Sequence, residues 1–585
     1  MPTNQDIART LREVSQLMQL AGENRFKVIA FDKAAQTIDG LTEPLTGYIE
    51  QRTLTDIKGI GKSIAEDIYV FSETGSMPVL ESFRQKVPPG LLKWLDISGL
   101  GPKNILKIHK EFDISTIEEL KEKIDDGSIA ALSGLGPKSA EKIKKSIQWM
   151  EEHNERCRLD EAREIGEAIF QSLKDLDGVQ QIEIAGSYRR SLETIGDIDI
   201  LIAADEAFIP SLFDAFTSHE RVLEVLGKGD TKSSVRTTEG RQVDLRIVKP
   251  EHFAAALMYF TGSKEHNVVM RSRARERGMA LNEYGLYQLD AEGATDFDAP
   301  VATQTETDIY ATLDLPFILP ELREDRGEFE LFEMHTELDL VTLSDIKGVI
   351  HAHSTWSDGK FSIKEMAQAC IERGYSYLGL TDHSKTAAYA GGLTTDRVKQ
   401  QWDEIDALNE AFEQNGTNFH IFKGIESDIL ADGSLDYPDS VLEGFDFIIA
   451  SVHQSLEMPR DQMMERFRNA IKNPYTRMIG HPTGRLLLKR DGSDIDLNEL
   501  IELAAEHNTA IEINASPYRL DLDWRFGNKA KEANLITSIN PDAHSITGID
   551  VMEYGVRIAR KAKFNKERVL NSWEMERVLA FFNAR

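Results

Sequence analysis

Hydrophobic positions follow three different patterns along this chain of 585 residues. Residues 1–155 carry short stretches of helical apolar spacing separated by glycine-rich breaks, which predicts a set of short helices. Residues 160–250 alternate amphipathic segments with β-branched runs such as Gln181–Ala185 and Asp197–Ile202, which predicts strands and helices in one unit. From about residue 345, short apolar strands alternate with helical segments, which predicts a parallel α/β architecture.

Composition and charge narrow the class of protein. The two cysteines, Cys157 and Cys370, exclude a disulfide framework and a cluster of thiolate zinc ligands. The chain has no run of about 18 apolar residues, and its first residues lack the blocks of a signal peptide. We therefore expect a cytoplasmic protein without a membrane span. The net charge of −30 argues against a nucleic-acid partner, although local lysines and backbone amides can still contact DNA.

A glycine motif recurs three times in the helical part, at Ile57–Ala65, Ile97–Ile105 and Leu132–Ala140. Its glycines permit a tight turn, and the helix that follows presents free amides and a positive dipole end to a phosphate. A single copy would favour an ordinary glycine-capped helical corner. Three copies resemble helix-hairpin-helix motifs, which hold the DNA backbone without reading sequence. The candidate DNA contacts are Gly59, Gly61, Lys62, Gly99, Gly101, Lys103, Gly134, Gly136 and Lys138.

Acidic residues recur on two predicted strands of the middle region. Asp197 and Asp199 are two residues apart in a β-branched run, so both carboxylates lie on one face of a strand. Asp244 lies on another predicted strand, and three such carboxylates suit two Mg²⁺ ions. The turn at Gly186 and Ser187, with Arg190, would hold a triphosphate. Scattered acids on a solvated strand are the alternative, but the upstream turn favours a nucleotidyltransferase.

Residues 1–320 resemble the family X DNA polymerases through GSYRR (186–190), GDIDIL (196–201), VDLR (243–246) and YFTGSKEHN (259–267), which occur in that order. The resemblance implies gapped or primer-template DNA and dNTPs as substrates. It implies Mg²⁺ or Mn²⁺ ions on three catalytic aspartates, Asp197, Asp199 and Asp244. The implied nucleotide contacts are Gly186, Ser187, Arg190 and Gly196 at the triphosphate, Tyr259, Phe260 and Gly262 at the sugar, and Asn267 at the base.

Histidines and acids follow the predicted strands of the C-terminal half. Alternation in His351-Ala-His353 places both imidazoles on one face, and the other candidates each end an apolar run or follow it in a turn. In barrel-type folds the carboxyl ends of strands carry the active site. Mixed imidazole and carboxylate ligands suit two or three Zn²⁺, Mn²⁺ or Fe ions. The nine candidate ligands are His351, His353, Asp358, His383, Glu426, His453, His481, Asp542 and His544.

Residues 346–575 resemble the PHP domain, named for polymerase and histidinol phosphatase, and all nine ligand positions are matched. The resemblance implies a distorted (β/α)7 barrel that hydrolyses phosphate esters. It also implies three metal positions, held by His351, His353, Glu426 and Asp542, by Glu426, His453 and His481, and by Asp358, His383 and His544. Arg485 and Asn514, in candidate strand-end loops, are weaker candidates for phosphate contacts.

The two halves together resemble the bacterial family X polymerases with a C-terminal PHP domain, a multidomain fold of α and α/β parts. The expected divisions are an N-terminal helical domain with a helix-hairpin-helix (1–85), fingers with two further hairpins (86–155), a nucleotidyltransferase palm with a mixed sheet (156–250), a thumb (251–320), a charged linker (321–345) and the PHP domain (346–575).

The expected function is gap-filling DNA synthesis in base excision repair or end repair, with 3′–5′ exonuclease activity at the PHP site. Removal of 3′-phosphates and incision at abasic sites are further candidate activities of that site. Two alternatives stay open: a PHP domain that is only a structural platform, and one that acts on a small phosphate ester. The sequence does not determine the native metals or the oligomeric state.

The chain departs from the family pattern at two positions. Gln242 stands where a basic residue often precedes the third aspartate. Asp67 stands where lyase-competent relatives carry a lysine that forms a Schiff base, and a carboxylate cannot form an imine. Lys33 and Lys62 are the nearby amines that could substitute for it.

We therefore predict that removal of a 5′-deoxyribose phosphate is weak or absent. The measurement is borohydride trapping of the protein on incised abasic DNA. A strong covalent adduct within residues 1–85 would overturn this prediction.

Overall fold

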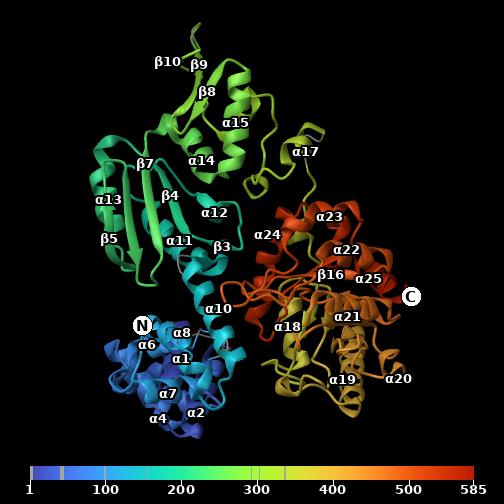
Figure 1. Cartoon of the computed structure of the whole chain (residues 1–585). Coiled ribbons are helices and arrows are strands. Elements are labelled where there is room, and N and C mark those ends of the chain that lie inside the picture. The colour runs from blue at the N-terminus through green and yellow to red at the C-terminus, as the bar shows by residue number, and fades with distance from the viewer. Residues whose placement is uncertain are drawn as a thin grey trace. The chain divides into compact units, whose positions relative to one another are not determined.

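The computed structural model describes residues 4–39, 45–95, 97, 100–153, 156–291, 293–301, 303–334 and 338–584. The chain forms two compact units (Figure 1). The first contains Met1–Asn154 with Ser545–Thr547, and the second contains Glu155–His544 with Gly548–Arg585. No helix in these described ranges is long and apolar enough to cross a membrane.

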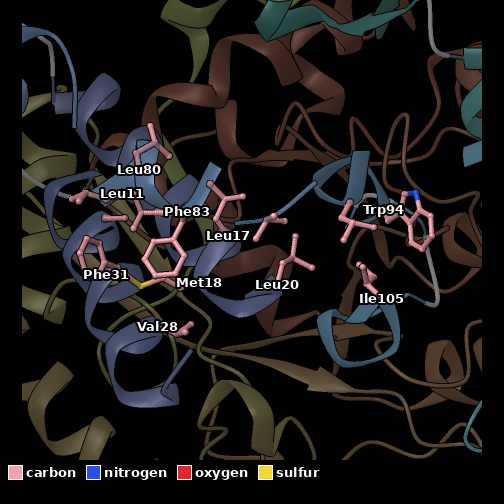
Figure 2. Close-up of a cluster of buried hydrophobic side chains, with 14 of the residues drawn as sticks. Leu11, Leu17, Met18, Leu20, Val28, Phe31, Leu80, Phe83, Trp94 and Ile105 are labelled. Atoms are coloured by element: carbon pink, nitrogen blue, oxygen red, sulfur yellow. The ribbon is translucent and has the colours of Figure 1, made fainter. Parts of the chain in front are cut away.

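The first unit is helical, as its sequence pattern predicts. Its helices are α1 (Asn4–Leu20), α2 (Arg25–Asp39), α3 (Thr46–Glu50), α4 (Lys62–Thr74), α5 (Pro78–Arg84), α6 (Pro89–Trp94), α7 (Pro102–Phe112), α8 (Ile117–Asp125), α9 (Ser128–Ala131) and α10 (Pro137–His153). Leu11 and Met18 lie on one face of α1 because their spacing of seven residues spans about two helical turns. Both belong to one buried core with Phe31 of α2 and Phe83 of α5 (Figure 2).

The second unit contains a five-stranded mixed sheet. Its order is β2 (Gln181–Ile184), β4 (Asp197–Ala203), β7 (Gln242–Val248), β6 (Lys232–Thr237) and β5 (Val222–Lys228). β4 runs parallel to β7, and the other neighbours are antiparallel. Helices α11 (Leu159–Leu173) and α13 (Ile209–Thr217) contact this sheet.

Alternation along β4 separates its two faces. Ile198 points toward Gly166 of α11, whereas Leu201 packs with Phe253 and Leu257 of α14 (Phe253–Thr261). Asp197 and Asp199 share the parity of Leu201, so both lie on the face that α14 partly covers.

A smaller antiparallel sheet follows, made of β8 (Met279–Asn282), β9 (Gly285–Leu289) and β10 (Thr295–Val301), with α15 (Lys264–Glu276) and α16 (Glu306–Thr312). The segment 321–345, which its charge pattern predicts as a linker, has a folded part with α17 (Glu328–Met334). Leu322, Phe329 and Phe332 of that segment are buried in the same core as the α15 and α16 side chains.

The described part of the C-terminal half holds seven parallel strands, β11 (Gly348–Ala352), β12 (Tyr377–Leu380), β13 (His420–Asp428), β14 (Phe447–Ser451), β15 (Thr476–Ile479), β16 (Ala510–Asn514) and β17 (Thr537–Asn540), in that spatial order. The helices between them include α18 (Ile363–Glu372), α19 (Thr395–Gln414), α20 (Asp439–Leu442), α21 (Arg460–Lys472), α22 (Leu497–Glu506) and α23 (Gly527–Glu532), and α24 (Met552–Lys561) follows β17. The His353 amide donates to the Ala543 carbonyl at 2.9 Å, which joins the first strand to the last. The barrel expected from the sequence is thereby confirmed.

The amino-terminal end of the barrel is closed by α25 (Met575–Asn583). Phe582 of this helix stacks on Phe447, with ring centroids 4.5 Å apart and an interplanar angle of 10°. Phe447 begins β14, so this contact lies at the end of the strand opposite to His453.

Replacing Phe447 by Ala should therefore destabilise the barrel without directly altering the carboxyl-end residues. We expect a loss of about 3–5 kcal/mol in free energy of unfolding, because a buried aromatic leaves a cavity. Thermal unfolding monitored within the barrel measures this loss. Leu579→Ala is the matched control in α25, since Leu579 is 39% exposed. Equal effects of the two substitutions would contradict the proposed role of Phe447.

Candidate active sites

The three middle-region acids converge as their spacing predicts. In the parallel pair β4–β7, Asp199 lies opposite Asp244, and Asp197 lies opposite Gln242. Each of the three carboxylates offers an oxygen, and these oxygens all lie within 4.8 Å of one another. Asp197 is exposed and Asp244 is buried, so the group opens to solvent on one side.

Electrostatic repulsion is strong in this group. Burial, together with the charges of Asp197 and Asp244, raises the pKa of Asp199 to about 7. Burial also acts to raise the pKa of Asp244, but hydrogen bonds from Lys232, Ser234 and Gln242 outweigh it and lower that pKa. The Gln242 amide donates to the Asp244 carboxylate at 3.0 Å. Gln242, the departure from the family pattern, thus holds the third acid in place.

A cleft of about 440 Å³ lies beside Asp197 and Asp199. All eight predicted nucleotide contacts line it: Gly186, Ser187, Arg190, Gly196, Tyr259, Phe260, Gly262 and Asn267. Gly186 has a φ of 62°, and a Cβ there would lie 2.5 Å from an Asp199 carboxylate oxygen. Only glycine therefore fits at this turn.

Cationic side chains that sequence reasoning missed also line this cleft, namely Arg156, Lys264 and Arg271. Arg156 lies some thirty residues before the Gly186 turn in the sequence and outside any motif. Arg190 is held by Glu324 at 3.0 Å and donates to the Thr261 carbonyl at 2.5 Å. The buried Asn267 side chain donates to the Tyr259 carbonyl at 2.7 Å, which leaves its own amide oxygen without a hydrogen bond among the described residues.

The glycine motifs of the first unit form helix starts. Gly61 and Gly101 are the residues before α4 and α7, and neither helix start has a side-chain cap. A Cβ at Gly61 or at Gly101 would meet no atom within 4 Å, so both turns are accessible. Gly59 and Gly134 have positive φ values of 105° and 85°. Lys62, Lys103, Gly136 and Lys138 lie in or beside these helix starts, whereas Gly99 lies outside the described residues.

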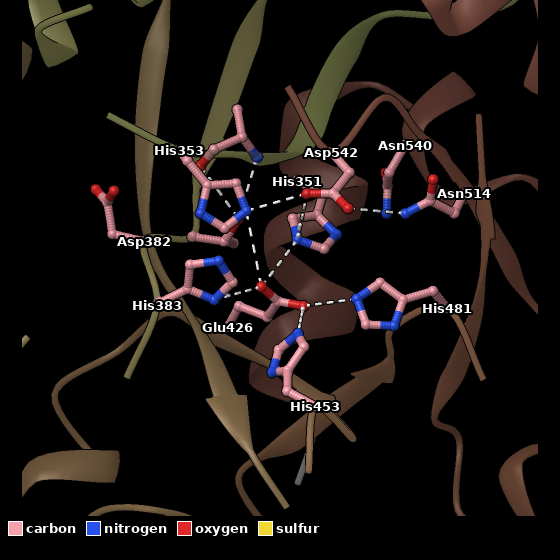
Figure 3. A network of polar contacts seen from close by, with 12 residues as sticks. His351, His353, Asp382, His383, Glu426, His453, His481, Asn514, Asn540 and Asp542 are labelled. Carbon is pink, nitrogen blue, oxygen red and sulfur yellow. Dashed lines mark hydrogen bonds and ion pairs between the residues drawn. The ribbon is translucent and has the colours of Figure 1, made fainter. Parts of the chain in front are cut away.

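All nine predicted ligands of the C-terminal half lie in or just after the barrel strands, or in the turn that follows β11. Figure 3 labels His351, His353, His383, Glu426, His453, His481 and Asp542. Glu426, in β13, occupies the centre of the group. One of its oxygens lies 2.9 Å from His481 Nε2 and 3.2 Å from His453 Nε2. The other lies 2.9 Å from His383 Nδ1 and 3.6 Å from His351 Nε2. This carboxylate is positioned to bridge two ions.

The remaining ligands surround this centre on two sides. His353 Nε2 lies 3.1 Å from an Asp542 oxygen, and His351 Nε2 lies 3.5 Å from the same oxygen. His353, Asp358, His383 and His544 form a second group, whose ligand atoms lie within 4.8 Å of one another. The structure therefore brings together all nine predicted residues. His353 and His383 each lie near ligands of more than one of the three predicted metal positions.

Buried ring nitrogens test whether this group suits metal ions. In the described residues, His351 Nε2, His353 Nδ1 and His481 Nδ1 are buried and make no hydrogen bond. Burial and the neighbouring His544 and His383 lower the pKa of His353 to about 3, so this imidazole is neutral and offers a lone pair. Imidazole nitrogens among carboxylates are the donor set that Zn²⁺, Mn²⁺ and Fe prefer. The residues present therefore fit a polynuclear metal centre.

Supporting acids orient the imidazoles, and sequence reasoning missed them. Glu512 accepts from His351 Nδ1 at 2.6 Å and from the His481 amide at 2.8 Å. Asp428 lies 2.9 Å from His453 Nδ1. Such outer contacts fix the tautomer and direction of a ligand. Two sequence features could have identified these acids. Glu512 interrupts the apolar strand Ile511-Glu-Ile513, and Asp428 follows Glu426 at the two-residue spacing of a strand face.

The two weaker phosphate candidates have other partners. Asn514 donates through its side-chain amide to Glu512 and to Asp542, at 3.1 Å each, so it belongs to the supporting network (Figure 3). Arg485 is bound to Asp523 at 2.8 Å. Tyr389 is instead 71% exposed with its ring 6.5 Å from that of His383, which places an open aromatic surface beside the proposed ligands.

The geometry defines a class: a nucleotidyltransferase site and a polynuclear phosphoesterase site on one chain. Family models match along its length: a helix-hairpin-helix domain (2–77), a SAM-like helix-hairpin-helix tandem (91–148), the DNA polymerase beta palm (156–235) and thumb (256–324), and the PHP domain (350–516).

Similar proteins agree with these matches. The chain is 41% identical over 578 residues to the DNA polymerase/3′–5′ exonuclease PolX of Bacillus subtilis (strain 168), covering 98% of each. Probable phosphatases of Thermoanaerobacter sp. (strain X514) and of Caldanaerobacter subterraneus subsp. tengcongensis are each 28% identical over 38% of this chain, covering 89% and 85% of their own lengths. The chain belongs to the family X DNA polymerases that carry a PHP domain. The polymerase and PHP domains imply the use of divalent metals, and the helix-hairpin-helix and thumb domains imply DNA binding.

Glu512 provides a direct test of the barrel's metal centre. Glu512→Gln keeps the shape of the side chain but removes the charge that orients His351. We expect affinity for Mn²⁺ to fall by about 10- to 100-fold, because outer-shell acids contribute that much. Calorimetric titration of the metal-free protein measures it. Glu567→Gln is the control, since Glu567 pairs only at the surface with Arg577. Unchanged affinity in Glu512→Gln would contradict the assignment.

Proposed function

We propose that the palm site extends DNA primers with dNTPs to fill gaps during base excision repair or end repair. The convergence of Asp197, Asp199 and Asp244 beside a cleft lined by the predicted nucleotide contacts supports this proposal most strongly. The three aspartates would hold Mg²⁺ or Mn²⁺. When bound, these ions supply activation of the attacking oxygen and neutralisation of phosphate charge.

The chain's own residues then position the nucleotide. We assign the Gly186 turn, with Ser187, Arg190 and Gly196, to the triphosphate. Tyr259, Phe260 and Gly262 would border the sugar, and the free amide oxygen of Asn267 would contact the base. The closeness of Gly186 to Asp199 keeps the phosphates next to the metal-binding acids.

Helix starts in the first unit would hold the DNA backbone. The uncapped amides that follow Gly61 and Gly101, with Lys62 and Lys103, suit phosphate oxygens. Contacts of this kind do not depend on sequence, as expected of a repair enzyme. The proposed domain boundaries are those predicted from the sequence. A cytoplasmic location also stays a prediction.

We assign 3′–5′ exonuclease activity to the barrel site, where His351, His353, Glu426 and Asp542 would hold one ion. Glu426, His453 and His481 would hold another, and Asp358, His383 and His544 a third. Two or three Zn²⁺, Mn²⁺ or Fe ions suit these donors, and when bound they supply water activation and charge stabilisation at phosphorus. The relative named as a polymerase and 3′–5′ exonuclease supports this activity.

Removal of 3′-phosphates is the second candidate activity of the barrel. The similarity of this half to probable phosphatases favours it. Both activities would act on the same DNA end, and both need the same metal centre. If a small phosphate ester were the sole substrate of the barrel, the helix-hairpin-helix motifs would serve the palm site alone.

Two single substitutions separate the sites. Asp197→Ala should abolish primer extension but leave 3′ degradation of a recessed duplex with Mn²⁺, because it removes a ligand of the palm only. His353→Ala should have the opposite effect. A removed metal ligand should lower the affected rate by at least about 100-fold. The measurement is a gel assay of extension and degradation on the same labelled DNA.

Each substitution is the other's folding control. Extension that persists in Asp197→Ala would contradict the polymerase site, and degradation that persists in His353→Ala would contradict the nuclease site. A parallel assay with a small phosphomonoester distinguishes the alternative: hydrolysis of this ester without degradation of DNA would identify a small-molecule phosphatase.

A further inference from the structure

A buried lysine of the barrel half contacts the backbone of Arg190, a residue that lines the nucleotide cleft of the palm half. Lys561 is the last residue of α24, and its side chain is 0% exposed. Its ammonium donates to the carbonyl oxygens of Arg190 and Glu321, at 3.0 Å each, and to a Glu324 carboxylate oxygen at 2.7 Å. The ammonium also lies 4.3 Å from the centre of the Trp524 ring. A buried charge needs partners of this kind, so Lys561 is firmly placed.

The same carboxylate oxygen also holds Arg190. Glu324 Oε1 accepts from Arg190 Nε at 3.0 Å and from Lys561 at 2.7 Å. Arg190 further donates to the Thr261 carbonyl at 2.5 Å. The guanidinium at the nucleotide cleft is therefore placed by a carboxylate that it shares with the barrel's lysine.

A second contact fixes the same loop from the barrel side. Glu193, three residues after Arg190, accepts from Trp524 Nε1 at 2.9 Å and from Arg525 at 2.6 Å. Although burial acts to raise its pKa, the charges of Arg525 and Arg485 lower the pKa of Glu193 to about 2. The loop that joins the Gly186 turn to the Asp197 strand is thus anchored at two points, and Trp524 takes part in both.

We infer that Lys561 is a positioning residue for nucleotidyl transfer: through Glu324, the barrel half sets the charge and direction of Arg190. This inference rests on the proposed contact of Arg190 with the triphosphate. While Lys561 shares the Glu324 carboxylate, Arg190 keeps net positive charge for the incoming anion. Without the lysine, Glu324 would pair fully with Arg190 and repel the triphosphate.

Lys561→Met in the full-length chain tests this inference, because methionine keeps a flexible apolar stem but has no charge. We expect the KM for dNTP in single-nucleotide gap filling to rise about tenfold, the effect of one lost charge-assisted contact. The kcat should change less than about threefold, because the weakened contact is that of Arg190 with the bound triphosphate before reaction. The 3′ degradation at the barrel site should stay unchanged. Lys561→Arg should restore most of the affinity.

Control variants separate electrostatic positioning from mere folding. Arg577→Met removes an exposed cation of the barrel, paired with Glu567, and should leave the KM unchanged. Lys561→Met combined with Glu324→Gln should return the KM to within about threefold of the parent, since no carboxylate then competes for Arg190. This double variant also replaces the carboxylate of Glu324 by a neutral amide, so it can be measured even where the single variant does not fold.

The outcomes also distinguish the inference from the proposed function. If Arg190→Met leaves the KM for dNTP unchanged, the assignment of Arg190 to the triphosphate fails. If Arg190→Met raises the KM but Lys561→Met does not, only the positioning role of Lys561 is overturned. It is likewise overturned if Lys561→Met lowers extension and 3′ degradation equally, or if the double variant keeps the raised KM of the single one.

Discussion

Carboxylates that face one another at short range repel, and the palm site of this chain is arranged around that repulsion. In the palm, the register of β4 and β7 places Asp199 opposite Asp244 and beside Asp197 in a partly buried group. In the barrel, burial acts to raise the pKa of Glu426 and of Asp542, but the surrounding histidines outweigh it and lower both pKa values well below their usual range. Protons can relieve such repulsion, but divalent cations relieve it while keeping the acids ionised. Dependence on metal ions therefore follows from the geometry of the strands themselves.

The residues that stabilise the barrel and the residues proposed to bind metal lie at opposite ends of its strands. Aromatic packing at its amino-terminal end, where Phe582 stacks on Phe447, contains no ligand. The carboxyl end instead carries histidines and acids whose directions are set by buried partners such as Glu512 and Asp428. Because strands of the barrel hold these residues, the donor atoms lie close together.

Much of this arrangement could be predicted from local spacing. The alternation in Asp197-Ile-Asp199 and in His351-Ala-His353 correctly indicated side chains on one face, because a strand has a period of two. The barrel itself followed from repeated strand and helix segments. The strand pattern did not predict a role for Glu512. A single acid between isoleucines becomes a candidate only when the fold brings its carboxylate next to His351 and the His481 amide.

Long-range pairing was likewise invisible in the sequence. Arg190 and Lys561 are 371 positions apart, and neither the charge pattern of 321–345 nor any motif indicated that Glu324 joins them. That segment has many charges, yet its Leu322, Phe329 and Phe332 are buried in the core of the thumb-like part, where they pack against residues far away in the chain.

The claim that two separate metal centres are built into one chain is tested most directly by crystals grown with Mn²⁺ and recorded near the manganese absorption edge. The account predicts anomalous peaks beside Glu426 in the barrel and, in crystals that also hold DNA and a non-reactive dNTP, beside Asp199 in the palm. Absence of the peak at Glu426 from well-ordered crystals with full Mn²⁺ would contradict it.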